Sequence, residues 1–169
     1  MLDYEKLARI DAVALDVDGV LTDGTFIWST SGEESKRFSF EDVMGLSRAR
    51  QAGLELALIS GEDSVLVDRF AKKLRITSVH KNCKDKGAAL RQFASTTGIP
   101  LDRIAFMGDD VNDLPALEIA GFAAAPANAQ PQVKVVAALI TERRGGQGAV
   151  RQLVEAILAA RSSPPGRTS

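Results

Sequence analysis

The stretch Asp16-Val17-Asp18-Gly19-Val20-Leu21-Thr22-Asp23-Gly24-Thr25 follows a short apolar run, residues 11–15, that contains no glycine or proline. Such a run is typical of a strand covered on both faces of a sheet. Because side chains alternate along an extended chain, Asp16 and Asp18 point to the same side. Paired carboxylates repel unless a cation lies between them, and oxygen ligands suit Mg²⁺. Taken alone, the pattern fits a solvated turn equally well, because Asp and Gly are common turn residues.

Strand-like and helix-like segments alternate along the rest of the chain, a pattern that predicts a parallel sheet with helices on both faces. Further strands are expected at residues 54–59, 77–80, 103–107 and 121–124. Helices are expected at residues 42–52, 63–74, 84–97, 112–120, 130–138 and 148–160. The residues expected to cap helix starts are Asp63 and Asn112, and those expected to follow helix ends are Gly53, Gly98 and Gly121.

The composition is that of an ordinary globular protein. Its 169 residues fit one domain, expected over residues 1–160, followed by a flexible tail at 161–169. The net charge of −1 does not match the basic character of nucleic-acid-binding proteins. No stretch reaches the roughly 18 apolar residues that a membrane helix needs. A single cysteine, Cys83, excludes an internal disulfide, which fits a cytoplasmic location. Neither nucleic acid nor a membrane is therefore an expected partner.

One segment interrupts the alternation of strands and helices. Residues 25–28 and 35–38 flank Ser29-Thr30-Ser31-Gly32-Glu33, which predicts a β-hairpin over residues 25–39. This hairpin would project from the sheet directly after the acidic stretch. Only residues 25–41 separate Gly24 from Asp42, too few for a separate lid domain.

Three more strand ends carry polar residues. Ligands of open parallel sheets bind beyond the carboxyl ends of the strands, so these positions are informative. Ser60 and Gly61 could hold a phosphate oxygen through a hydroxyl and an unhindered N–H group. Lys86 is expected near a helix start, and Asp109, Asp110 and Asp113 follow the strand at 103–107. Five acids at strand ends require compensation, for which a bound cation and a lysine are the economical explanation.

In this order, D-x-D-G-V-L-T-D-G, a strand-end Ser-Gly, a downstream Asp-Lys and G-D-D-x-N-D-L-P resemble the haloacid dehalogenase (HAD) superfamily. The chain is most similar to its small capless branch of 3-deoxy-ulosonic acid phosphate phosphatases. That branch includes 3-deoxy-D-manno-octulosonate 8-phosphate phosphatase and the phosphatases of nine-carbon sialic-type sugar acids. The resemblance covers residues 11–160 and implies a Rossmann-like three-layer α/β fold with a projecting hairpin and no cap. It also implies a cytoplasmic Mg²⁺-dependent phosphatase that serves surface-polysaccharide precursor synthesis.

The resemblance implies a role for each polar strand end. Asp16 would attack phosphorus and become an aspartyl phosphate, and Asp18 would serve as general acid and base. Mg²⁺ would bind the Asp16 and Asp109 carboxylates and the Asp18 carbonyl. The phosphoryl group would be held by Ser60, the Gly61 backbone and Lys86. Asp110 and Asp113 could orient metal-bound waters or Lys86, or could only brace the helix start.

Departures from the family pattern bear on the substrate. Glu62 and Lys73 resemble the Glu/Lys pair of the nine-carbon enzymes, where the pair meets the longer sugar acid. Residues eleven apart on a helix lie about three turns apart on one face, so both could contact one substrate; Lys73 could equally be a solvated lysine. Arg143 and Arg144 could bind a substrate carboxylate or be surface charges. An eight-carbon substrate therefore stays open.

The resemblance further implies a homotetramer in which the hairpin of one subunit closes the active site of its neighbour. Phe26 and Trp28 fit this arrangement, because an aromatic hairpin needs cover. A rival reading is a non-catalytic HAD-like assembly module of the kind associated with sugar-acid activation. The complete set of acids argues against that reading.

Overall fold

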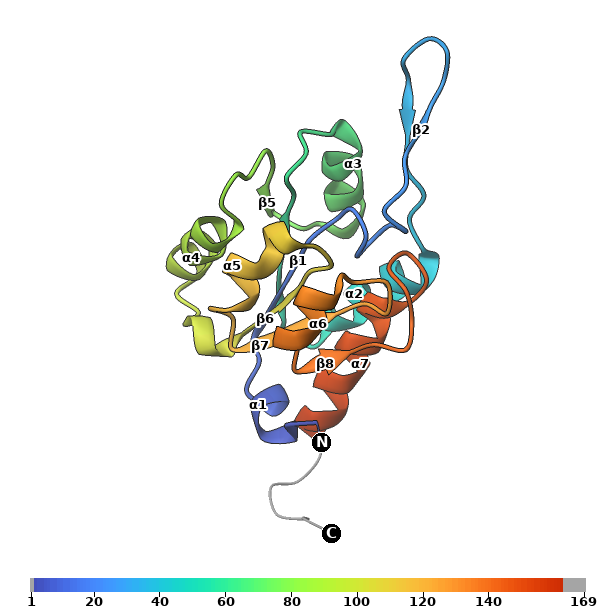
Figure 1. Ribbon diagram of the computed structural model, residues 1–169. Helices are drawn as coiled ribbons and strands as arrows, with labels where there is room; N and C mark the ends of the chain where they lie inside the picture. Colours follow the sequence, from blue (N-terminus) through green and yellow to red (C-terminus); the bar gives the residue numbers. More distant parts are fainter. Residues whose placement is uncertain (1, 163–169) are drawn as a thin grey trace.

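The computed structural model describes residues 2–162, in which six strands form one sheet in the order β5-β4-β1-β6-β7-β8 (Figure 1). Every pairing in this sheet is parallel. The strands are β1 (Ala12–Leu15), β4 (Glu55–Ile59), β5 (Ser78–His80), β6 (Ile104–Met107), β7 (Phe122–Ala125) and β8 (Leu139–Ile140). The predicted parallel α/β fold is confirmed.

The strand order reverses beside β1. Counting only the strands of this sheet along the chain, the spatial order is 3-2-1-4-5-6, which is the order of the doubly wound Rossmann fold. The point of reversal lies between β1 and β6, whose last residues, Leu15 and Met107, are register partners. Ligands of such sheets bind at this point, so the residues that follow Leu15 and Met107 are placed for function.

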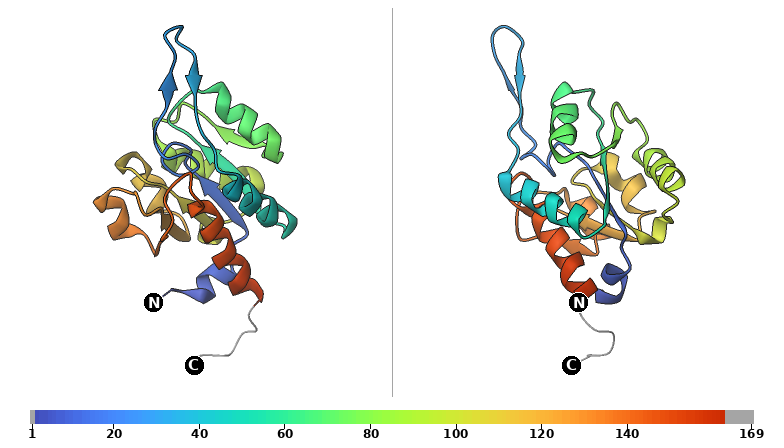
Figure 2. Two further views of the ribbon diagram at one scale, coloured as in Figure 1. Left: turned by 90° about the vertical axis from the view of Figure 1, so that its right-hand side faces the viewer. Right: turned by 180° about the vertical axis from the view of Figure 1, so that it is seen from behind.

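Helices cover both faces of the sheet, so the fold has three layers with the sheet in the middle (Figure 2). The helices that pack on one face are α1 (Tyr4–Ala8), α2 (Phe40–Gln51), α3 (Val65–Leu74) and α7 (Ala149–Ser162). Those on the other face are α4 (Lys86–Thr97), α5 (Leu114–Leu117) and α6 (Pro131–Val136). Two short 3₁₀ turns, η1 (Leu101–Arg103) and η2 (Val111–Asp113), precede β6 and α5.

Strand β1 supplies both halves of the core. Val13 and Leu15 pack with the α7 side, and Ala12 and Ala14 pack with the α4 side. All four side chains are fully buried. Burial on both faces explains why the sequence of β1 shows an unbroken apolar run instead of the alternation of a half-exposed strand.

Two expected helix caps differ from the observed ones. The α3 helix is capped by Ser64, whose Oγ accepts a hydrogen bond from the Leu66 N–H, whereas Asp63 forms an ion pair with Lys81. At η2 the cap is Asp110, not Asn112. Serine and aspartate both cap well, so the sequence could not rank such close neighbours.

Helix ends also differ in part from the prediction. Gly98 ends α4 in the left-handed conformation, as expected. The helix predicted over 130–138 ends at Val136, and the chain then forms the short edge strand β8, which was not predicted. Helix α1 was not predicted either, and α7 continues through Ser162, two residues into the expected tail. The remainder of that tail, 163–169, lies outside the described residues. No helix among residues 2–162 has the length and hydrophobicity needed to cross a membrane.

The predicted hairpin stands away from the body of the molecule (Figure 1). Its strands are β2 (Ile27–Trp28) and β3 (Glu34–Ser35), and they pair antiparallel. Phe26 and Trp28 lie in ring contact, yet both are more than half exposed, as is Ile27. Exposed aromatic and aliphatic side chains are therefore gathered on this one projecting element.

Candidate active site

A cavity of about 240 Å³ lies at the carboxyl ends of the central strands, at the switch point of the sheet. Its walls come from the loops after β1, β4 and β6 and from the start of α4. The residues that line it are Asp16, Asp18, Gly24, Gly61, Glu62, Lys86, Asp109, Asp110 and Asn112. Most of the residues predicted from the sequence therefore meet here. Asn112 also lines the cavity but was considered only as a helix cap.

The loop after β1 brings Asp16 and Asp109 together. The Asp16 N–H donates to the Met107 carbonyl at 3.0 Å, which extends the pairing of β1 with β6 by one residue. Gly19 then turns with φ +90°, and a Cβ on it would lie 2.0 Å from Asp109 Oδ2. Only glycine allows the loop to adopt this conformation and to pass so close to the Asp109 carboxylate.

Lys86 joins two carboxylates in the interior. Its Nζ donates to Asp16 Oδ1 at 2.7 Å and to Asp113 Oδ1 at 2.6 Å. The lysine is 2% exposed, and it begins α4 directly after the helix cap Asp85. Burial by itself lowers the pKa of Lys86, but Asp16 and Asp113 outweigh burial and raise the pKa above its ordinary value. The lysine is therefore held as a cation against the end of β1.

Asp113 braces the loop that carries Asp109. Its Oδ2 accepts the N–H groups of Asp109 and Asp110 at 2.8 and 3.1 Å, and its Oδ1 accepts Lys86. A Cβ on Gly108 would lie 2.5 Å from the Cβ of Asp113, so a glycine is required beside this brace. Because both Asp113 oxygens are already paired, this residue orients Lys86 and the loop.

The carboxylates of Asp16, Asp109 and Asp113 offer oxygens within 4.8 Å of one another, a spacing that suits a metal ion. In the described part of the chain, the Asp109 carboxylate receives no hydrogen bond from a nitrogen, in contrast to Asp113. Burial, followed by repulsion from Asp113, raises the pKa of Asp109 to about 6. Burial, and after it repulsion from Asp113, also raises the pKa of Asp16 well above its ordinary value, whereas the positive charge of Lys86 lowers it. The cluster therefore fits a divalent cation held by Asp16 and Asp109.

The raised pKa of Asp109 predicts how stability depends on pH in the absence of metal. Between the ordinary value of 3.8 and about 6, the native state binds more protons at Asp109 than the unfolded state does. The free energy of unfolding should therefore fall as pH rises through this window. Asp109→Asn removes this titration, so the variant should gain stability over the wild type from pH 4 to pH 6 and keep that gain up to pH 7.5. Urea denaturation in EDTA measures the difference.

Comparing the two proteins at each pH cancels the titration of the shared groups that do not interact with Asp109, whereas the pKa of Asp16, which Asp109 raises, should fall in the variant. A stability difference that stays constant from pH 4 to pH 7.5 would contradict the raised pKa of Asp109. In a matched series with 5 mM Mg²⁺ we expect the wild type to be stabilised at pH 7.5 and the variant to respond weakly, because a ligand stabilises only the state that binds it.

The end of β4 contributes Ser60, Gly61 and Glu62. Ser60 is fully buried, and its Oγ accepts the Glu62 N–H at 3.1 Å. Glu62 lies in the loop before α3, outside the helix, so the argument that it shares a helical face with Lys73 was wrong. Lys73 is exposed in the last turn of α3 and does not line the cavity.

The segment 143–148 packs its backbone on the loop after β1. The Asn128 side chain donates to the Gly19 carbonyl at 2.9 Å and accepts the Gly145 N–H at 2.6 Å. A Cβ on Gly145 would lie 1.9 Å from the Gly19 carbonyl oxygen, so this contact requires glycine. Arg143 and Arg144 are exposed beside it and do not line the cavity. Gly145 and Asn128 therefore both support the loop after β1. The sequence did not reveal this role of Asn128.

The hairpin adds a lysine to the site that was not predicted. Lys36 Nζ lies 2.5 Å from Asp18 Oδ1 and 3.7 Å from Glu34 Oε1. The Lys36 side chain is 2% exposed and that of Asp18 is 30% exposed. These residues are 18 positions apart, and no local pattern announces their contact.

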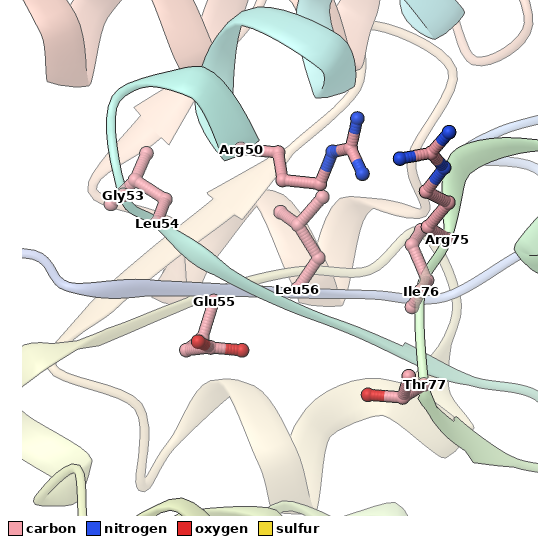
Figure 3. Close-up of a pocket in the computed structure, with 8 residues that line it drawn as sticks. All are labelled: Arg50, Gly53, Leu54, Glu55, Leu56, Arg75, Ile76 and Thr77. Carbon is pink, nitrogen blue, oxygen red and sulfur yellow. The ribbon is translucent and has the colours of Figure 1, made fainter.

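A second cavity of about 250 Å³ lies at the amino end of β4, beside the ends of α2 and α3 (Figure 3). The side chains of Arg50 and Arg75 extend to the same side there, and Glu55 points away from them. The two cavities have nearly equal volumes, so they have to be distinguished by the chemical groups that line them. Among the residues that line this second cavity, Glu55 is the one carboxylate, and none is a buried lysine. The second cavity therefore lacks the groups needed for phosphoryl transfer.

Comparisons with known proteins identify the family of the chain. The family model described as haloacid dehalogenase-like hydrolase matches residues 76–153. The 3-deoxy-D-manno-octulosonate 8-phosphate phosphatase KdsC of Yersinia pestis is 32% identical over 164 residues, which are 97% of this chain and 88% of that protein.

Solved structures give the same relationship. The crystal structure of 3-deoxy-D-manno-octulosonate 8-phosphate phosphatase from Moraxella catarrhalis, in complex with a magnesium ion, a phosphate ion and a KDO molecule, is 41% identical with a TM-score of 0.91. It covers 94% of this chain, and 91% of its own chain is matched. The cobalt-bound phosphatase of Haemophilus influenzae is 34% identical with a TM-score of 0.89, covering 92% of this chain and 91% of that one. The chain therefore belongs to the 3-deoxy-D-manno-octulosonate 8-phosphate phosphatase family of haloacid dehalogenase-like hydrolases, which are phosphoric monoester hydrolases.

Proposed function

We propose that this protein is a Mg²⁺-dependent phosphatase of a 3-deoxy-ulosonic acid phosphate, with 3-deoxy-D-manno-octulosonate 8-phosphate as its substrate. The observation that carries the proposal is the buried Lys86 between Asp16 and Asp113, beside the Asp109 carboxylate at the switch point. A buried cation among carboxylates, open to a cavity, suits a dianionic phosphate and its transfer.

Asp16 is the proposed nucleophile. Lys86 occupies Oδ1, whereas Oδ2 receives no hydrogen bond from a nitrogen in the described residues. In the first step an Asp16 oxygen forms a bond to phosphorus, the bond from phosphorus to the sugar oxygen breaks, and the electron pair stays on that oxygen. Asp18, which lines the same cavity, supplies the proton that this oxygen takes up.

The second step hydrolyses the aspartyl phosphate. Asp18, now ionised, takes a proton from water while the water oxygen bonds to phosphorus and Asp16 leaves as a carboxylate. Lys86 stays beside the Asp16 oxygen in both steps and stabilises negative charge on the transferring group. The Gly61 N–H and the Ser60 hydroxyl are proposed to hold the phosphoryl oxygens.

Asp16, Asp109 and the Asp18 carbonyl are proposed to hold Mg²⁺. When bound, the ion neutralises charge between an anionic nucleophile and an anionic substrate. The raised pKa of Asp109 supports this assignment, because burial, followed by the neighbouring Asp113, disfavours the ionised carboxylate, and a bound cation would offset both effects.

The names of the relatives support an eight-carbon substrate, and Glu62 at the cavity wall is the residue to test for sugar selection. Lys73, Arg143 and Arg144 do not line the cavity, and their contact with the substrate stays a prediction. The exposed Phe26, Ile27 and Trp28 support a homotetramer in which hairpins cover neighbouring sites. Assembly and a cytoplasmic location stay predictions.

A substrate comparison tests the proposal. With Mg²⁺, kcat/KM for 3-deoxy-D-manno-octulosonate 8-phosphate should exceed that for a nine-carbon sialic-type 9-phosphate by about tenfold, a difference typical of one added carbon unit. Phosphate release measures both rates, and glucose 6-phosphate serves as the unrelated control. Equally poor turnover of both sugar acids would refute the substrate class. Preference for nine carbons would refute the eight-carbon assignment alone, and Glu62→Gln should then change the ratio.

A further inference from the structure

The hairpin of this chain reaches its own active site through one side chain. Lys36 follows β3 and turns inward, so that its Nζ lies 2.5 Å from Asp18 Oδ1. Among the described residues, Lys36 is the only one that donates a hydrogen bond to the Asp18 carboxylate. A lysine that is 2% exposed is unusual, because burial costs its charge several kcal/mol unless the charge is paired.

A chain of polar contacts fixes Lys36 in turn. Glu34 Oε1 lies 3.7 Å from Lys36 Nζ and accepts the Ser64 hydroxyl at 3.5 Å. Its other oxygen, Oε2, accepts the Trp28 indole N–H at 3.1 Å. The position of Lys36 is therefore tied both to the exposed aromatic part of the hairpin and to the start of α3.

Proton transfer requires this kind of restraint. A carboxyl group on a loop can rotate about two side-chain bonds, whereas a general acid has to hold its proton within hydrogen-bond reach of the leaving oxygen. A hydrogen bond from Lys36 to Oδ1 fixes the rotation of Asp18 and leaves Oδ2 to exchange the proton. The need for such a proton is greatest when the leaving oxygen is an alkoxide, as in a sugar phosphate.

We propose that Lys36 is a positioning residue that orients the Asp18 carboxyl group for proton transfer to the sugar oxygen, and that it thereby links the hairpin to the chemical step. The inference rests on the proposed function. It assigns Lys36 no contact with the phosphate, so its whole effect on rate passes through Asp18.

Leaving groups of different basicity separate this role from a structural one. p-Nitrophenolate leaves without protonation, whereas the sugar alkoxide needs a proton. For Lys36→Met, kcat/KM for 3-deoxy-D-manno-octulosonate 8-phosphate should fall about 30- to 100-fold, within the range of general acid catalysis. For p-nitrophenyl phosphate it should fall by less than about threefold. Lys36→Arg keeps a cationic donor and should restore at least a third of the lost selectivity for the sugar phosphate.

A double-mutant cycle with Asp18→Asn tests whether Lys36 acts through Asp18. In the Asp18→Asn background, Lys36→Met should cause no further loss on the sugar phosphate, because two residues that act as one unit are not additive. Equal losses on both substrates, or a full additional loss in the double variant, would overturn the proposal. The proposed function is judged separately, by whether the wild type hydrolyses the sugar phosphate with Mg²⁺ at all.

Discussion

Asp16→Asn should lower kcat for 3-deoxy-D-manno-octulosonate 8-phosphate by at least about 10⁴-fold, the scale on which hydrolytic enzymes lose rate when their nucleophile is removed. The amide oxygen of asparagine is a poor nucleophile toward phosphorus, and the amide nitrogen of this side chain cannot bind a cation. The carbonyl oxygen of the new side chain can still accept the hydrogen bond from Lys86, so the fold should persist. Phosphate release with saturating Mg²⁺ measures the loss, and thermal unfolding measures the fold.

Asp23→Asn is the matched control for this variant. Asp23 lies on the same loop but is outside the cavity, where it pairs with Arg37 and accepts hydrogen bonds from Thr25. We expect it to retain most of the activity. Turnover by Asp16→Asn within tenfold of the wild type would remove Asp16 from the mechanism. Inactivity of the wild type with every sugar acid phosphate and Mg²⁺ would instead favour a non-catalytic assembly module.

Lys86→Met should be both unstable and inactive. Methionine fills a similar volume, but the change leaves Asp16 and Asp113 buried without their cation. Breaking a buried ion pair by removing one partner typically costs 3–5 kcal/mol, so the free energy of unfolding should fall by about that amount. The activity should fall by at least about 10³-fold, because the charge beside the transferring phosphoryl group is lost. Urea unfolding in EDTA and phosphate release measure the two effects.

A second variant separates the two effects of Lys86. Adding Asp113→Asn to Lys86→Met removes one of the two carboxylates left without a cation, so part of the lost stability should return. Activity should not return, because Asp113 is proposed to act only by bracing Lys86 and the loop of Asp109. Recovery of activity together with stability would show that Lys86 has only a structural role.

The sequence predicted the strands that position the site because their signals are local. The runs before Asp16 and Asp109 are short, apolar and followed by acids, and strand ends in a parallel sheet meet at one edge. The register that pairs Leu15 with Met107 then brings the two acids together. Lys86 could be placed near a helix start for the same reason, although the helix begins at this residue and not at 84.

The parts that the sequence did not predict depend on contacts between distant segments. Lys36 reaches Asp18 only because the chain that returns from the hairpin after β3 passes beside the loop after β1. Asp42 is fully buried in the first turn of α2, where it accepts the N–H groups of Gly148 and Arg151 at the start of α7. Burial raises its pKa in spite of these bonds. Neither contact has a local pattern, because each depends on how separate elements pack.

The two-residue strand β8 was missed for another reason. Leu139 and Ile140 continue an apolar segment that begins within α6, so no change of periodicity separates helix from strand. The helical phase assumed for Glu62 and Lys73 failed because α3 begins at Val65, after the Ser64 cap, so Glu62 is not part of the helix. Glu62 instead lies in the preceding loop, at the cavity wall.

The most direct test of the account is to trap the phosphoryl group on the protein. Wild-type protein with Mg²⁺ and 3-deoxy-D-manno-octulosonate 8-phosphate, labelled in the phosphate, is quenched in acid within the first turnover and digested. We expect label on the peptide that contains Asp16, and no label in the Asp16→Asn variant or without Mg²⁺. Release of labelled phosphate at full rate with no label at Asp16 at any quench time, or equal labelling of the variant, would contradict it.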